Sequence, residues 1–478
     1  MSGTVGAAGP EPGRSGAATT TRPVPGPVRP YHFPRFERRA LPNGVQLLVA
    51  PMHALPVVTV HVLLDAGAAR DPVGREGVAT LTAQLLAEGT TSLEGAALAD
   101  RFERLGAALA TGADWDSAWC ESTVLTPRLD AVLTLLAEVV RSPAFAPREA
   151  DRLVAQRLAA LLEQRAEPRG LADDMFARFV YAPRARYGVP AGGSETSVRG
   201  LGRGDVVQFH QRHVVPASTT IVIAGDVSAD AAARLVAERF GDWRPSGSFA
   251  ESPAGNGAAP LDAESPDARG VHVIAKPDAP QSEVRVGHVA IPRAHPDWLP
   301  VHVMNAILGG LFSSRINLNL RERHAYTYGA FSTVDARRHA GTFDVSTAVE
   351  SDVTAPAVRE ILTEIARMQE APVGADELSL ATAYLEGVFP IRYETTEAVA
   401  GALANVAIFG LPADYYDGYR GRVRALSADD VWRAARTHLR PEAARVVVVG
   451  DAARVREPLG GLGLGPVRVW DAAGAPLA

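Results

Sequence analysis

A set of residues in the first half of the chain recurs in the second half at one constant spacing, and this repeat constrains the fold more than any other feature. Each residue of the first set is found again 225 positions later. The first set is Leu201, Asp205, Val206, His213, Pro216, Gly225 and Asp226, and the second is Leu426, Asp430, Val431, His438, Pro441, Gly450 and Asp451. A constant offset over so many landmarks indicates an internal duplication. We therefore expect two homologous domains.

The size of the chain and its apolar periodicity agree with a duplication. A chain of 478 residues, of which 47% are hydrophobic, exceeds what one core usually organises. Periodicity predicts helices over 74–88, 93–105, 128–141, 147–166, 170–180, 204–213, 229–240, 297–309 and 313–323. It predicts strands over 45–49, 57–65, 107–125, 220–224, 270–276, 282–292 and 326–350. Each half thus predicts an α+β domain with a mostly antiparallel sheet covered on one face by helices.

Composition sets the expected boundaries of these domains. Residues 1–30 are rich in Gly, Ala, Pro, Ser and Thr, which predicts a disordered tail. An N-terminal domain over 31–243 and a C-terminal domain over 270–478 are separated by a Pro/Gly/Ser-rich linker over 244–269. Two such domains facing each other would enclose a cavity, where chemistry is expected.

Net charge and cysteine content limit the kinds of binding partner and the cellular compartment that we expect for this chain. The formal charge is −6 with a pI near 6.1, and no dense Lys/Arg block is present, which argues against nucleic acid and membrane as partners. The longest apolar runs are of strand length, so no membrane span is expected. Cys120 is the only cysteine, which excludes an intrachain disulfide and a multi-cysteine zinc site. We expect a cytoplasmic location.

Residues 317–329 are predicted to be the end of an amphipathic helix that turns directly into a strand. Arg321 would lie in the last helical turn and Tyr328 on the strand. A guanidinium and a phenol that converge in this way could hold a peptide carbonyl without covalent chemistry. The alternative is a helix-end arginine beside a half-buried strand tyrosine with no shared role.

Several short motifs together carry a resemblance to a known family. In the first half they are Leu41-Pro42-Asn43-Gly44, Gly67 with Asp71 and Gly74, Gly77-Val78-Ala79, Gly89-Thr90, and Tyr187-Gly188 with Pro190 and Gly193; in the second they are Gly309-Gly310, Ser313-Ser314-Arg315 and Leu320-Arg321-Glu322-Arg323 with Tyr328. The chain resembles the pitrilysin-like or insulinase-like (M16) zinc peptidases, most closely their two-domain branch, which includes processing peptidases. The resemblance implies two homologous α+β domains that form a clam-like chamber.

Active members of that family carry an H-x-x-E-H zinc motif on a helix, with two imidazoles on one face and a glutamate base beside them. The resemblance places this motif at positions 80–84, where the chain has Thr80, Ala83 and Gln84, and the third ligand near Ala160. Glu163 is about one turn away and is expected to be a solvated helix residue. A hydroxyl and an amide cannot replace two imidazoles as zinc ligands. We therefore expect a degenerate peptidase centre and no metal bound by this chain.

The remaining histidines and nucleophiles offer no replacement centre. His210 and His213 are three residues apart on a predicted helix without an accompanying carboxylate pair, and the recurrence of His213 as His438 favours a packing or capping role. The chain has no G-x-S-x-G elbow and no P-loop.

The resemblance gives Arg321 and Tyr328 a role, because family members place such a pair opposite the zinc helix to bind the substrate backbone. In heterodimeric members one subunit supplies the zinc and another supplies the pair. The expected function is therefore a non-catalytic subunit of a heterodimeric zinc peptidase that acts on peptides, with a zinc-motif paralogue as partner and the zinc held by that partner. The alternative is a non-proteolytic scaffold similar to processing-peptidase-like core subunits.

Overall fold

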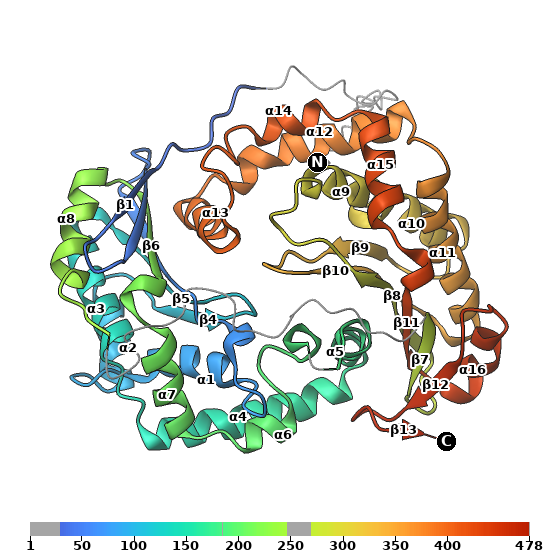
Figure 1. Cartoon of the computed structure of the whole chain (residues 1–478), viewed down its shortest axis with the longest axis horizontal. Helices are drawn as coiled ribbons and strands as arrows, with labels where there is room; N and C mark the ends of the chain where they lie inside the picture. Colours follow the sequence, from blue (N-terminus) through green and yellow to red (C-terminus); the bar gives the residue numbers. More distant parts are fainter. Residues whose placement is uncertain (1–28, 184, 246–268, 478) are drawn as a thin grey trace, which may run out of the picture. The chain divides into compact units, whose positions relative to one another are not determined.

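The computed structural model describes residues 29–183, 185–245 and 269–477 (Figure 1). Most of the predicted tail (1–30) and of the predicted linker (244–269) lies outside these ranges, so both stay predictions. No helix in the described ranges is long and apolar enough to span a membrane.

The two halves share a series of elements in the same order, to which the first half adds β1 at its start and the second adds β12 and β13 at its end. The first half holds β1 (Glu37–Ala40), β2 (Gln46–Pro51), β3 (Val57–Leu64), α1 (Val78–Leu85), α2 (Gly95–Arg104), β4 (Ala110–Ala113), β5 (Ala118–Leu125), α3 (Leu129–Arg141), α4 (Pro147–Ala166), α5 (Pro168–Val180), α6 (Glu195–Arg199), α7 (Arg203–His213), β6 (Thr219–Gly225) and α8 (Ala229–Phe240). The second half holds β7 (Gly270–Ala275), β8 (Gln281–Val289), α9 (Trp298–Asn305), α10 (Arg315–Asn317), β9 (Ala330–Val334), β10 (Thr342–Glu350), α11 (Thr354–Glu370), α12 (Ala375–Arg392), α13 (Thr396–Phe409), α14 (Tyr419–Arg424), α15 (Ala428–His438), β11 (Arg445–Gly450), α16 (Ala452–Gly460), β12 (Val467–Trp470) and β13 (Pro476–Leu477).

The two sheets have matching topologies, which confirms the predicted α+β fold. The first sheet has the order β1-β2-β6-β3-β5-β4 and the second β13-β12-β7-β11-β8-β10-β9, so β2-β6-β3-β5-β4 corresponds to β7-β11-β8-β10-β9. Most neighbouring strands are antiparallel, but β6 is parallel to β2, and both β11 and β12 are parallel to β7. Both sheets are therefore mixed. The strands that close each repeat, β6 and β11, are almost entirely buried in the middle of their sheets.

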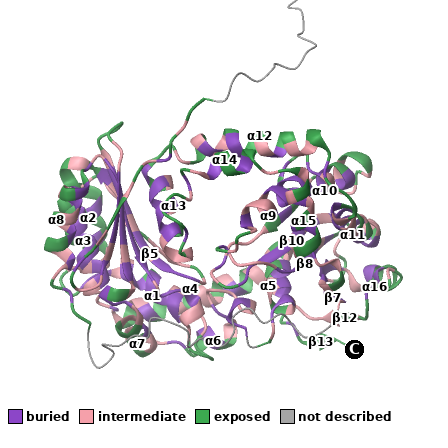
Figure 2. Ribbon diagram, turned by 45° about the horizontal axis from the view of Figure 1, so that its top comes forward, coloured by how far each residue is buried: buried purple, intermediate pink, exposed green. Residues whose placement is uncertain are grey.

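The helix arrangement differs from the expectation of coverage on one face only. Each sheet is also covered by a helix from the other half of the chain, since α13 packs on β3 and β6, and α5 packs on β8 and β11 (Figures 1 and 2). Each of these helix–sheet contacts includes a hydrogen bond: Thr59 Oγ1 donates to Thr396 Oγ1 at 2.8 Å, and Arg285 Nε donates to Asp173 Oδ1 at 2.7 Å. The two halves exchange corresponding helices, and the chain from Phe33 onward is one compact unit.

The physical reason for the exchange lies in the strand sequences. β3 is buried along seven of its eight residues, and β11 is buried along all six, so both faces of these strands are shielded from solvent, although Thr59 and His61 make one face of β3 partly polar. A sheet that is apolar on both faces needs cover on both faces. α13 is apolar around most of its circumference and buries Val399, Leu403 and Val406, as expected for a helix placed between two layers.

Candidate functional site

Helix α1 carries the positions that correspond to the zinc motif, and their environment does not suit a metal. Thr80 is half-buried, Ala83 is buried and Gln84 is exposed. The Thr80 hydroxyl donates a hydrogen bond to the Ala191 carbonyl at 3.1 Å. This bond orients the Thr80 hydroxyl toward Ala191, and a neutral hydroxyl is in any case not among the ligands that zinc favours.

Arg157 of α4 lies beside these positions. It lines a cavity of about 10 Å³ together with Thr80 and Gln84, and its Nε donates to the Gly192 carbonyl at 2.9 Å. Burial lowers the pKa of Arg157 below its ordinary value, an effect that Asp174 opposes. Gly192 permits this contact, because a Cβ there would be 2.5 Å from Arg157 Nη2.

The residues at the family's zinc position therefore do not fit a zinc ion. A guanidinium repels a dication, and neither a threonine hydroxyl engaged elsewhere nor an exposed amide compensates for it. Ala160, one turn beyond Arg157 on α4, has no ligating atom, and Glu163 is exposed as expected. Within the described residues, no group of three potential ligands includes a residue of α1 or α4. Sequence reasoning missed Arg157, although its position three residues before Ala160 places both on one face of the helix.

Arg321 and Tyr328 lie on either side of a helix end. Arg321 belongs to a π-helical turn (Leu318–Arg323), and Ala325, at φ +53°, ends the helical conformation. Tyr328 lies two residues before β9 and not on the strand, which corrects the sequence expectation. The strand begins later because Thr347 Oγ1 donates to Thr327 Oγ1 at 3.0 Å and to the Gly329 carbonyl at 3.1 Å, which holds residues 327–329 in a turn.

The two side chains have different surroundings. The Arg321 guanidinium lies over the ring of Phe312, with Cζ 4.6 Å from the ring centroid, and its Nε is 3.5 Å from Glu322 Oε1. Tyr328 is 94% exposed and lines the main cavity of the described residues. No interaction between described residues joins Arg321 to Tyr328, and Arg321 does not line the cavity that Tyr328 lines, so their shared role stays a prediction.

That main cavity has a volume of about 1220 Å³ and is lined by residues of both halves. One wall comes from α4 and α5, and the other from β8, β10, β9 and the turn with Tyr328. β9 is the last strand of its sheet, and its Phe331 and Thr333 line the cavity. The outer edge of β9 is partly occupied, because Asn305 Nδ2 donates to the Ser332 carbonyl at 3.1 Å and the Ala330 N–H donates to Asn317 Oδ1 at 3.1 Å.

Charged groups of both signs line this cavity. Arg285 is almost fully buried; burial alone would lower its pKa, but Asp173 and Glu283 raise it above its ordinary value. Burial raises the pKa of Asp174 to about 6. Burial also raises the pKa of Asp344 to about 6, against the effect of the hydrogen bond from Thr333 Oγ1 at 2.8 Å. Sequence reasoning missed this cluster, because its members come from strands and helices far apart in the chain.

The remaining candidates behave as structural residues. His210 contacts the Val140 carbonyl through Nε2 at 2.8 Å, and the ring of His213 packs on Phe209 with centroids 4.7 Å apart. Burial lowers the pKa of His213 to about 4. Burial raises the pKa of the Cys120 thiol to about 12, so this cysteine is no nucleophile at neutral pH.

The matching sheets and the cavity lined by both halves define a duplicated α+β protein. Comparisons with known proteins give the family to which this fold belongs. The family model described as insulinase (peptidase family M16) matches residues 49–182, and the model described as peptidase M16 inactive domain matches residues 200–385. The chain belongs to the M16 insulinase family, with an N-terminal domain of that family and a C-terminal domain of its inactive type.

Relatives in this family include both a non-peptidase and proteins named as zinc proteases. A non-peptidase homolog of Helicobacter pylori is 23% identical over 81% of this chain and 87% of its own length. An uncharacterized zinc protease of Mycobacterium leprae is 23% identical over 82% of this chain and 85% of its own length. Among solved structures, a peptidase M16 inactive domain from Pseudomonas fluorescens has a TM-score of 0.78 at 24% identity, covering 87% of this chain and 98% of its own. A protease from Helicobacter pylori has a TM-score of 0.78 at 19% identity, covering 88% and 100%, and both likenesses concern the fold.

Proposed function

We propose that this chain is a non-catalytic subunit of a heterodimeric zinc peptidase and that it helps to hold a peptide for a partner that carries the zinc. The observation that supports this most is the state of the family's zinc position. Thr80 and Gln84 replace the imidazoles, and the Arg157 guanidinium occupies their neighbourhood. A chain built in this way has no means to activate water at that position.

The main cavity offers groups suited to an extended peptide. The exposed Tyr328 phenol can donate a hydrogen bond to a peptide carbonyl. The mixture of Arg285 with Asp173, Asp174 and Asp344 favours backbone recognition over selection of one charge. Arg321 would join Tyr328 only after its guanidinium leaves the Phe312 ring, an interaction of modest strength on an exposed aromatic.

The second candidate is a non-proteolytic scaffold. It is favoured by the contact of the Arg321 guanidinium with the Phe312 ring and by the similarity to a relative that is named a non-peptidase homolog. A scaffold needs the fold and its surfaces but not a carbonyl-binding phenol in the cavity. The two functions therefore differ in what they require of Tyr328.

Reconstitution with a zinc-motif paralogue from the same genome tests the proposal. The complex is expected to cleave unfolded peptides, and both Tyr328→Phe and Arg321→Ala are expected to lower kcat/KM about tenfold or more, the effect of losing a hydrogen bond of about 1.4 kcal/mol. Tyr326→Phe and Arg323→Ala are matched controls, because they remove the same groups from the same segment. Unchanged kinetics in Tyr328→Phe, or a complex with no activity, favours the scaffold.

A further inference from the structure

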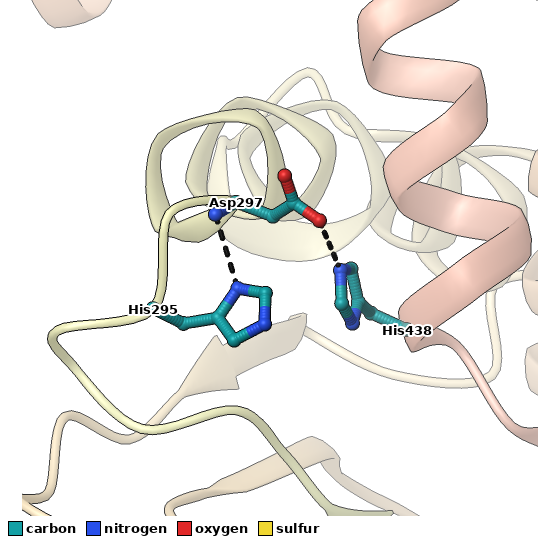
Figure 3. Close-up of side chains that lie close together, drawn as sticks. All are labelled: His295, Asp297 and His438. Atoms are coloured by element: carbon teal, nitrogen blue, oxygen red, sulfur yellow. Dashed lines mark hydrogen bonds and ion pairs between the residues drawn. The ribbon is translucent and has the colours of Figure 1, made fainter.

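Three potential metal ligands meet where helix α9 begins and helix α15 ends (Figure 3). They are His295, Asp297 and His438, and one ligating atom from each lies within 4.8 Å of the other two. All three residues are half-buried. Over the described part of the chain this is the one such group of three, and it is separate from positions 80–84 of the family's zinc motif.

The local hydrogen bonds hold these side chains toward one another. His295 Nδ1 accepts the backbone N–H of Asp297 at 3.0 Å, and His438 Nε2 is 2.8 Å from Asp297 Oδ2. The two imidazole rings lie nearly perpendicular, with centroids 5.2 Å apart. Figure 3 shows the Asp297 carboxylate above both rings. Two imidazoles and a carboxylate thus surround one small volume.

Ordinary structural roles do not account for this arrangement. Asp297 is the N-cap residue of α9, but its side chain makes no capping hydrogen bond and turns to His438 instead. An aspartate at this position normally accepts an N–H of the first helical turn. His213, the repeat counterpart of His438, packs on Phe209 and belongs to no such group. The duplicated fold therefore does not require the cluster.

We propose that His295, Asp297 and His438 form a binding site for a divalent transition-metal ion, with Zn²⁺ as its expected occupant. Zinc favours imidazole nitrogen and carboxylate oxygen at roughly 2.0–2.2 Å in tetrahedral geometry. Small changes in side-chain torsion angles would bring the three ligand atoms to that geometry. The Asp297 side chain is 46% exposed, so a fourth coordination position stays open to water. The metal takes the place of the proton on His438 Nε2, and that proton passes to His438 Nδ1 or to solvent. His295 binds through Nδ1, whose lone pair turns from the Asp297 N–H to the ion while Nε2 keeps its proton.

Such an ion would fasten the start of α9 to the end of α15. This inference does not rest on the proposed function, because a subunit without peptidase activity can hold a structural ion. It revises the sequence-based expectation that the chain binds no metal, but it leaves the zinc motif on α1 degenerate.

The test uses the full-length protein stripped of metal with EDTA. Calorimetric titration with Zn²⁺ is expected to give one ion per chain, and Co²⁺ is expected to give visible d–d absorption of a four- or five-coordinate site. His295→Asn is the sharpest variant, because an asparagine at that position can still accept the N–H of Asp297, and it leaves the Asp297–His438 bond in place. Asp297→Asn keeps the shape of the hydrogen bond to His438 but removes the charge.

Losing a residue that only orients a metal ligand weakens metal binding by roughly 10–100-fold. Both variants are expected to weaken Zn²⁺ binding by more than that and to abolish the Co²⁺ absorption, because they remove a ligand. His213→Ala, the matched control in the first half, is expected to bind as the wild type does. Circular dichroism checks that each variant is folded. The proposal is overturned if the wild type binds no Zn²⁺, or if His295→Asn and Asp297→Asn bind it as tightly as the wild type. These readouts do not involve peptidase activity, so failure here leaves the proposed function untouched.

Discussion

Replacing Asp344 by asparagine tests the electrostatics of the main cavity. Asp344 lies on β10, and its carboxylate accepts a hydrogen bond from Thr333 Oγ1 at 2.8 Å. Burial raises its pKa from 3.8 to about 6. Asparagine has nearly the same shape and can still accept from Thr333, but it cannot ionise. The substitution therefore removes the desolvation cost of the half-buried negative charge together with its attraction to Arg285 and its repulsion by Asp173 and Asp335.

The sign and size of the effect follow from linkage between protonation and folding. The folded-state pKa of Asp344 is raised, so the folded protein binds this proton more tightly than the unfolded chain does. The stability that Asp344 contributes is complete below the unfolded pKa and is lost as the pH rises through about 6. One pH unit corresponds to about 1.4 kcal/mol. Between pH 5 and pH 8 the wild type should thus lose about 1.4 kcal/mol relative to Asp344→Asn.

Urea unfolding followed by circular dichroism at pH 5 and pH 8 measures this difference. Asp344→Asn is expected to unfold at higher urea concentration than the wild type at pH 8, with a smaller advantage at pH 5. Asp151→Asn, at an exposed position of α4, controls for the general loss of one negative charge. If the advantage of Asp344→Asn were the same at both pH values, the assignment of a raised pKa to this carboxyl would be wrong.

Three further predictions concern packing and reactivity. Arg338→Met removes the ion pair between Arg338 Nη1 and Asp65 Oδ1 at 2.9 Å, which joins the two halves. Because both groups are partly exposed, we expect the free energy of unfolding in urea to fall by about 1–3 kcal/mol. An unchanged free energy of unfolding would contradict this role. Gly192→Ala places a Cβ 2.5 Å from Arg157 Nη2, so the guanidinium must move, and the loss of its hydrogen bond to the Gly192 carbonyl should destabilise by about 0.5–1.5 kcal/mol. The loss should be smaller in an Arg157→Ala background, and equal losses in both backgrounds would refute the contact. Cys120 should resist a thiol reagent at pH 8 in the folded protein and react after denaturation, and fast labelling of folded protein would disprove its burial.

The repeat made the fold predictable from sequence. The landmarks from Leu201 to Asp226 and from Leu426 to Asp451 recur at one offset, and the structure gives helices α7 and α15 and strands β6 and β11 at matching positions. Long periodic segments such as 128–141 and 147–166 were predicted to within about one residue, because their apolar spacing is strong.

The features that depend on tertiary packing were out of reach of the sequence. The exchange of α5 and α13 between the sheets covers strands that are buried on both faces, but nothing local in the sequence tells which helix covers them. Tyr328 was expected on a strand, and hydrogen bonds from Thr347, on the neighbouring strand, hold it in a turn instead.

Two site features were missed for a related reason. Arg157 carries no signal in the sequence pattern of a zinc site, because a guanidinium is not a zinc ligand. The pKa of Asp344 depends on the packing of β9, β10 and α5 around it, which alternation along a strand does not encode.

Peptide hydrolysis by the purified chain, alone and with a zinc-motif paralogue, tests the central claim most directly. An unfolded reporter peptide is incubated with the chain, the paralogue and the mixture, each with and without a chelator. The account predicts no hydrolysis by the chain alone, even with Zn²⁺ supplied, and chelator-sensitive hydrolysis by the mixture that exceeds that of the paralogue alone. Chelator-sensitive hydrolysis by the chain alone would contradict the account, because Thr80, Gln84 and Arg157 offer no means to hold a catalytic zinc at that position.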